Sequence, residues 1–323
     1  MGGQVVEGDI VALQSALSAF DISLSYEDIA REIDRPFLLT GSAEWLDRSI
    51  IQLYPRMQTD LPDELFAFRL RTYSQLCFYG VRFAGVWCRD RAMLPPLVES
   101  PFDQDTVYIL LCHTDRRIPV LFKTEEHVVS LNDSTVDWNE EVATCSAPNG
   151  FFVVTVTRGE QLPAPMPREY IGRARQELEA QTIFRFATPT HPIRVYQAWH
   201  LGHASLEIIA IAAQEAAPLA IVSDTVAQVF ATFHARAQLA YTHIEVLERR
   251  DGTTTQRRAL YDALKSKYLD VFFLLELACT QFPIGVPVRA LIRAEGTLLA
   301  EVCRDARLVY ADVCRDMELL EGE

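Results

Sequence analysis

The sequence GEQLPAPMP at residues 159–167 carries three prolines within five residues, Pro163, Pro165 and Pro167. Proline cannot donate to a strand ladder or continue a helix, so this stretch predicts a linker. The patterns on its two sides differ in kind. We therefore expect an α+β domain at residues 1–162, with helices followed by an antiparallel sheet, and an all-α helical bundle domain at residues 163–323.

Before the linker, helical patterns come first and strand patterns follow. Helices are expected at residues 9–20, 25–33, 42–54 and 64–79, with Ser25 and Ser42 as N-caps. Short β-branched and aromatic runs predict strands at residues 81–87, 107–112, 118–122, 128–131 and 151–157. This order favours an α+β fold over the strict alternation of a doubly wound fold.

After the linker, apolar residues recur at three- and four-residue spacing, which predicts helices and no strand. The expected helices are residues 168–180, 193–213, 223–249, 256–280 and 286–320. The apolar stripes 208–213 and 274–278 would also allow a homodimer.

The composition restricts the partners and the compartment. Forty-four acidic against thirty basic side chains give a formal charge of −14, which argues against nucleic acid. Apolar runs are too short to span a membrane, and the N-terminus lacks signal-peptide features. Seven cysteines without a CxxC pair indicate reduced thiols. We expect a cytoplasmic protein.

Standard signatures of cofactor and hydrolase chemistry are missing from the sequence. It contains no GxGxxG after a strand, no GxxxxGK[ST] and no GxSxG. We expect no cofactor, and isolated histidines are the remaining candidates for catalysis.

The residues with most chemical content are His113 and the pair Asn132-Asp133. His113 follows an expected strand, and the pair follows the second strand after it. An antiparallel sheet can return the later segment beside the earlier one, within reach of the imidazole. A histidine base with an Asn or Asp that orients it belongs to a cysteine-protease triad. The alternative is a strand-end histidine bonded by a loop carbonyl, followed by an ordinary Asn-Asp-Ser turn.

The whole first half has a recognisable order: an N-terminal helix, a second short helix, Gly41-Ser42, and a sheet with His113 and Asp133 about 20 residues apart. Further matching residues are Gln4, VALQSAL at 11–17, ISLS at 22–25 and GFF at 150–152. This order resembles the papain-like cysteine peptidases of family C39 and the related acyltransferases typified by the butirosin biosynthesis enzyme, which add a C-terminal helical part. The resemblance covers roughly residues 4–158. It implies His113 as base and Asp133 or Asn132 as its orienter.

The sequence departs from that family at the nucleophile. In the family a cysteine begins the first helix, and a glutamine shortly before it helps to form the oxyanion hole. Here Gly8 or Asp9 stands at that position, and the first cysteine is Cys77. Without a thiol the acyl-enzyme route is closed. The first hypothesis is therefore a catalytically degenerate relative, with Gln4, Gly8 and Asp9 in its substrate cleft, that binds a peptide or a carrier-tethered acyl group for a partner enzyme.

The second hypothesis is an active amide-forming or amide-cleaving enzyme that uses His113 and Asp133. Its nucleophile would be a substrate amine or a thiol from elsewhere, for example Cys77, Cys88 or Cys112. Cys112 adjoins His113, but neighbouring strand residues point to opposite faces, which disfavours that dyad.

The third hypothesis is a metal-dependent enzyme in the second half. His200 and His203 stand three residues apart, so a helix would present both on one side, with Glu207 one turn further on. His234 and His243 are nine residues apart and would face opposite sides, so only one of them could join. The ExxH repeats of di-metal bundles are missing, and histidines that only bridge helices are the alternative, so no metal is assigned. A purely structural protein is the fourth possibility.

Overall fold

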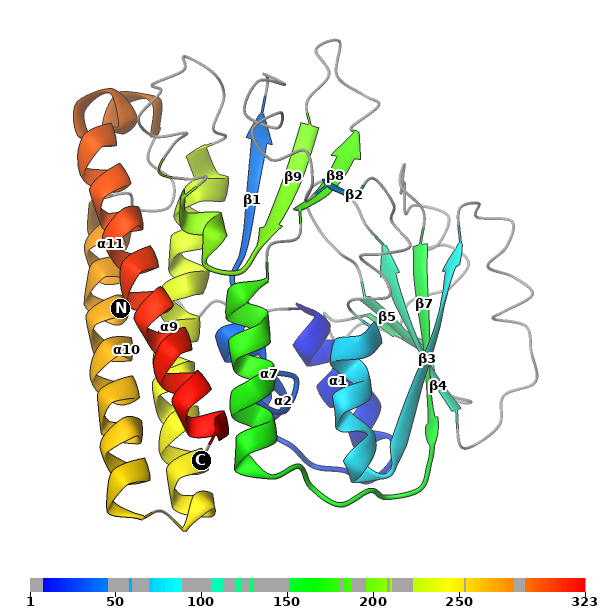
Figure 1. Cartoon of the computed structure of the whole chain (residues 1–323). Coiled ribbons are helices and arrows are strands. Elements are labelled where there is room, and N and C mark those ends of the chain that lie inside the picture. Colours follow the sequence, from blue (N-terminus) through cyan, green and yellow to red (C-terminus); the bar gives the residue numbers. More distant parts are fainter. Residues whose placement is uncertain are drawn as a thin grey trace. The chain divides into compact units, whose positions relative to one another are not determined.

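The computed structural model describes residues 8–45, 58–59, 70–88, 106–112, 120–123, 128–130, 151–180, 183–187, 196–207, 210, 223–252, 254–281 and 288–322 (Figure 1). It is a mixed helix and sheet structure in two compact units. Unit 1 contains the described residues within Asp34–Asp60 and Pro165–Glu323, and unit 2 those within Val6–Ile33 and Leu61–Ala164.

Unit 2 pairs short helices with a five-stranded sheet. The helices are α1 (Gly8–Ser18), α2 (Tyr26–Glu32) and the 3-10 helix η3 (Gln75–Tyr79). The strands are β3 (Val81–Cys88), β4 (Thr106–Cys112), β5 (Val120–Lys123), β6 (Val128–Ser130) and β7 (Phe151–Arg158). They follow the order β3-β7-β4-β5-β6, and every neighbouring pair is antiparallel. Helix α1 packs against β4 and β5.

Local sequence explains the helices of unit 2. Ile10, Leu13 and Leu17 recur at helical spacing on α1 and are buried. The Ser25 hydroxyl accepts a hydrogen bond from the Asp28 backbone N–H at 3.1 Å, which confirms Ser25 as the N-cap of α2. The five strands confirm those expected between residues 81 and 157.

The α-helices whose full bounds lie within the described residues of unit 1 are α7 (Pro167–Glu179), α9 (Ser223–Asp251), α10 (Thr255–Gln281) and α11 (Val288–Gly322). Helix α10 packs along both α9 and α11, and α7 packs against α11. The 3-10 helix η1 (Arg35–Phe37) packs against α9 and α7. These four helices confirm four of the five expected after the linker.

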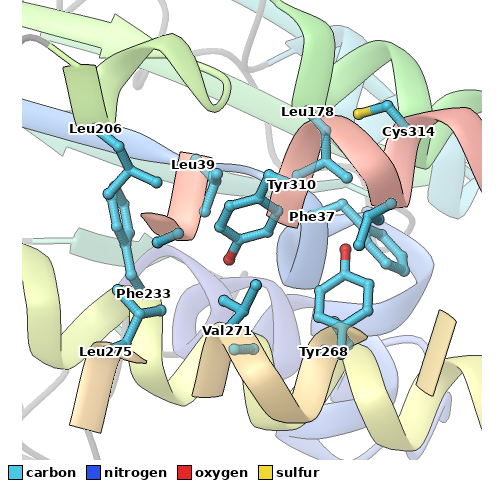
Figure 2. Close-up of a cluster of buried hydrophobic side chains, with 14 of the residues drawn as sticks. Phe37, Leu39, Leu178, Leu206, Phe233, Tyr268, Val271, Leu275, Tyr310 and Cys314 are labelled. Atoms are coloured by element: carbon cyan, nitrogen blue, oxygen red, sulfur yellow. The ribbon is translucent and has the colours of Figure 1, made fainter. Parts of the chain in front are cut away.

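The core of unit 1 joins side chains from distant parts of the chain (Figure 2). Phe37 packs edge-on against Tyr268 of α10, and Tyr268 packs edge-on against Tyr310 of α11. The Tyr268 hydroxyl points into this cluster and has no hydrogen-bond partner among the described residues, and burial raises the pKa of Tyr268 well above its usual range. The hydrophobic contacts therefore outweigh one unsatisfied phenol.

Unit 1 also contains a four-stranded sheet. Its strands are β1 (Thr40–Trp45), β2 (Gln58–Thr59), β8 (Ile183–Ala187) and β9 (Tyr196–Leu201), in the order β1-β9-β8-β2. β9 is antiparallel to β1 and β8, whereas β2 is parallel to β8. The sheet thus combines segments from both sides of the linker.

This sheet corrects three expectations. Residues 42–45 belong to β1 and are not the start of a helix, and residues 196–201 form β9 and are not helical. The second half is consequently not all-α, and residues 34–60 join it in one unit across the expected boundary at 162. The reason is non-local: β1 and β9 stabilise each other by pairing, and a periodicity within one segment does not contain that information.

The linker itself is confirmed. Residues 159–166 have no helix or strand, and α7 begins directly at Pro167, where a missing N–H costs nothing. The Met166 N–H donates to the Glu169 carboxylate at 2.8 Å and completes this start. None of the helices within the described residues has both the length and the apolarity that crossing a membrane requires.

Candidate functional site

Three strands of unit 2 end at the same edge of their sheet. β3 and β4 run in one direction because β7 lies antiparallel between them, and β6 shares this direction because β5 lies antiparallel between it and β4. Their last residues, Cys88, Cys112 and Ser130, therefore lie at one edge, which we call the carboxyl edge.

The register fixes which residues of this edge are neighbours. Phe151 lies opposite Cys88 on one side and Cys112 on the other, so these three residues form one row across β3, β7 and β4. Leu121 lies opposite Leu110 and Ser130, which forms a second row across β4, β5 and β6. The register therefore places the backbones of Cys88, Phe151 and Cys112 side by side at the carboxyl edge.

Three of the residues expected to form a papain-like site follow two of these strands along the chain. His113 directly follows β4, and Asn132 and Asp133 come two and three residues after the end of β6. His113, Asn132, Asp133 and Gln4 lie outside the described residues. Gly8 and Asp9 are the first two residues of α1.

The cysteines fall into two groups. Cys77 is half-buried in η3, whereas Cys88 and Cys112 end strands at the carboxyl edge. In unit 1, burial raises the thiol pKa of Cys279 to about 11 and those of Cys303 and Cys314 to about 12. These three thiols stay protonated at neutral pH and are poor nucleophiles.

The proposed metal ligands are not brought together on a helix. His200 lies in β9, opposite Gly41 and Ile183, and the chain then turns at Gly202 and His203. The expectation that His200, His203 and Glu207 share one helical face is therefore wrong. The described residues contain no group of three or more His, Cys, Asp or Glu side chains that could hold a metal ion.

His203 and Glu207 have other surroundings. Burial lowers the pKa of His203, the Arg307 guanidinium lowers it further, and the Glu179 and Glu207 carboxylates oppose both effects. Its Nδ1 atom is buried and accepts or donates no hydrogen bond within the part of the chain that the structure describes. Glu207 forms an ion pair with Arg307 at 2.9 Å. His203 is consequently a neutral imidazole at the end of a turn.

The two histidines of α9 pack against different rings. His234 stacks on Phe272 with 4.1 Å between ring centroids, and burial lowers its pKa. His243 is buried between the rings of Phe37 and Tyr170, at 5.8 Å from each. Both histidines thus serve packing between elements of unit 1, which agrees with the expectation that they do not share one site.

Sequence reasoning missed a buried charged group in unit 1. The Asp34 side chain is 1% exposed and accepts hydrogen bonds from Arg173 Nε at 2.7 Å and Nη2 at 3.4 Å. The Arg173 guanidinium also lies 4.5 Å from the centre of the Tyr170 ring, and the Arg250 guanidinium lies 5.4 Å from it. No local signal marks this group, because 139 residues separate Asp34 from Arg173.

Comparison with known proteins adds no assignment for these residues. No protein-family model matches the chain, and no curated protein matches it. Any function must therefore be argued from the carboxyl edge, the start of α1 and the surface of unit 1.

Proposed function

We propose that the chain is a papain-like protein without its nucleophilic cysteine, which binds a peptide or a carrier-tethered acyl group for a partner enzyme. One observation carries this proposal. The helix that begins at Gly8 packs against β4, the strand whose end leads into His113. A first helix that packs against the strand preceding the histidine is what the resemblance to family C39 implies, here with Gly8-Asp9 in place of a thiol.

The positions of His113 and Asp133 along the chain support the same proposal. Leu110 and Ser130 lie in one row of the sheet, and His113 and Asp133 each come three residues later in the sequence. A base and its orienting carboxylate would be supplied by two such segments. Because neither Gly8 nor Asp9 can form a thioester, the expected outcome is binding without turnover.

The remaining expectations belong to the same proposal. The papain-like domain would be joined to a helical bundle formed by α7, α9, α10 and α11. The described cysteines Cys77, Cys279, Cys303 and Cys314 are free thiols, which suits the reducing cytoplasm.

The test restores the missing nucleophile with the substitution Gly8→Cys. A thiol at this helix start, with His113 as its base, should be alkylated by iodoacetamide at pH 6.5 at least about tenfold faster than an ordinary exposed cysteine, because its pKa is lowered. Peptide-level mass spectrometry separates this thiol from the seven natural ones. The variant should also hydrolyse octanoyl-pantetheine, which the unmodified chain should leave intact.

Two controls make the result specific. Ser15→Cys places a thiol at an exposed position of the same helix. Combining Gly8→Cys with His113→Ala separates assistance by the imidazole from the effect of the helix dipole. If Gly8→Cys reacts like Ser15→Cys, or equally fast without His113, the papain-like proposal is wrong.

One observation favours a second candidate, an active acyltransferase or peptidase. Cys88 and Cys112 lie in one row at the carboxyl edge, where a thiol could replace the missing nucleophile. In that case the unmodified chain would hydrolyse octanoyl-pantetheine, and either Cys88→Ser or Cys112→Ser would abolish this activity while Cys77→Ser would not.

A further inference from the structure

The outer surface of α10 carries an apolar stripe. Leu269, Phe273 and Leu277 recur every four residues and are 42%, 60% and 40% exposed. This spacing places them on one side of the helix, along about 12 Å of its axis. Neighbouring residues Val271, Leu275 and Ala278 are buried in the core of unit 1, so the stripe is separate from the surface that α10 uses to pack against α9 and α11.

Acidic groups border this stripe. Asp270 and Glu276 are exposed and form no ion pair with any described residue. Between residues 259 and 280 the only basic residues are Lys265 and Lys267. Lys265 is paired with Glu248 and Asp262 at 2.9 and 2.7 Å, and Lys267 with Asp316 at 2.6 Å. Among the described residues of α10 from 259 onward, the stripe therefore has a negative border without an unpaired lysine or arginine.

The border argues against a second copy of this chain as the occupant. In an antiparallel contact centred on Phe273, each flank of the stripe would lie beside the same flank of the other copy, Asp270 with Asp270 and Glu276 with Glu276. In a parallel contact, the Asp270 flank of one copy would lie beside the Glu276 flank of the other. Like charges directly opposed across an interface are unfavourable, and a chain with a formal charge of −14 adds to this repulsion.

We propose that the α10 stripe is the docking surface for a partner protein that presents an amphipathic helix with an apolar face and lysine or arginine flanks. The apolar face covers Leu269, Phe273 and Leu277, and the basic flanks meet Asp270 and Glu276. Packing of one helix against another at the i, i+4 spacing provides the contact, and charge complementarity selects the partner. This inference concerns unit 1 only and is independent of the papain-like proposal.

The test uses the full chain and a designed peptide. The probe is a fluorescein-labelled 18-residue helical peptide of leucine and lysine, with leucines on one face, and its binding is followed by fluorescence anisotropy in 150 mM NaCl. Phe273→Ser should weaken binding about tenfold, since a central aromatic residue usually carries much of an interface. Asp270→Lys combined with Glu276→Lys should weaken it at least as much.

Matched variants on α11 serve as controls. Leu308 is 66% exposed, so Leu308→Ser removes an equally accessible apolar side chain elsewhere. Glu301→Lys combined with Asp305→Lys changes the net charge by the same amount at two other exposed positions. Each control should change the affinity by less than about twofold, because neither touches the α10 stripe.

Other outcomes would overturn the proposal. If a peptide with glutamate in place of lysine bound equally well, charge complementarity would not select the partner. Equal losses in the α10 and α11 variants would show non-specific attraction to an acidic protein. A dimer in sedimentation that Phe273→Ser dissociates would identify a second copy as the occupant, and binding to phosphatidylcholine vesicles that Phe273→Ser abolishes would identify a lipid surface.

Discussion

Gly202 lies in the turn that follows β9 and closes against the end of α7. Its backbone is in the left-handed region, with φ of +77°, and a Cβ atom here would overlap the Ala180 carbonyl oxygen. The Gly202 N–H donates to the Leu39 carbonyl at 2.9 Å, and the His203 N–H donates to the Leu178 carbonyl at 2.8 Å. The turn after β9 is thus joined through backbone groups to the residue before β1 and to α7.

Gly202→Ala should lower the free energy of unfolding by more than about 2 kcal/mol, because a methyl group meets backbone that cannot move away. Urea unfolding followed by circular dichroism measures this loss. Gly252 is the matched control, since it has φ of +59° with no atom within 4 Å of its Cβ position. Gly252→Ala should cost about 1 kcal/mol, from backbone strain alone. Equal losses in the two variants would contradict the steric argument.

The roles of single residues could be predicted from the sequence where they depend on residues nearby in the chain. Ser25 was predicted as a cap because it precedes a helical pattern with acidic Glu27 and Asp28 in its first turn, and its hydroxyl accepts a hydrogen bond from the Asp28 N–H. The roles of His200 and His203 were mispredicted, because the spacing of three residues assumed a helix. The surroundings of His113 and Asp133 remain a prediction.

At the scale of elements, the ion pair between Asp34 and Arg173 holds η1 to α7. Asp34 is buried and precedes η1 with φ of +52°, whereas Arg173 reaches it from the middle of α7. A buried carboxylate is tolerated only when a partner compensates its lost hydration. The pair therefore fixes the position of Phe37, the last residue of η1, in the core.

Arg173→Ala should lower the free energy of unfolding by about 3 kcal/mol, because it removes the guanidinium that donates two hydrogen bonds to the buried Asp34 carboxylate. The comparison is Arg315→Ala, which removes an ion pair of similar length, 3.0 Å to Asp312, from a side chain that is 71% exposed. That variant should lose less than about 0.5 kcal/mol. Urea unfolding measures the loss of free energy of unfolding in both variants. Similar losses would refute a special role for the buried pair.

Some helices and strands could be predicted from the sequence, and others could not. Helices α1, α2, α7, α9, α10 and α11 and strands β3 to β7 follow from periodicity, caps and β-branched runs within each segment. Strands β1 and β9 do not. Ser42 followed by Glu44 is typical of a helix start, and Tyr196 and Trp199 fit a helical spacing, yet the pairing of the two strands overrides both preferences.

At the scale of the whole molecule, the two units are interleaved along the chain. Residues 34–60 belong to unit 1, although they lie between two segments of unit 2. Phe37 and Leu39 from this stretch are completely buried in the core of unit 1, and β1 pairs along its whole length with β9. The boundary predicted at residue 162 lies close to the point where the chain passes from unit 2 to unit 1 at residues 164–165. It did not predict the earlier passages at residues 33–34 and 60–61.

A fragment of residues 165–323 should therefore be less stable than the same residues in the full chain. Hydrogen exchange of α9 and α10, followed by mass spectrometry, should be more than about tenfold faster in the fragment, because it lacks Phe37 and Leu39. Adding a synthetic peptide of residues 34–60 should restore part of the protection. Identical exchange in fragment and full chain would show that this segment is dispensable.

The pairing of β1 with β9 also matters while the protein is being made. Thr40–Trp45 leaves the ribosome about 150 residues before Tyr196–Leu201, which is a delay of roughly 8 to 30 s at about 5–20 residues per second. During that time β1 lacks the strand that satisfies its backbone, and unpaired strand edges promote aggregation. The nascent chain is thus most vulnerable between these two points of synthesis, when a chaperone that holds extended segments would be of most use.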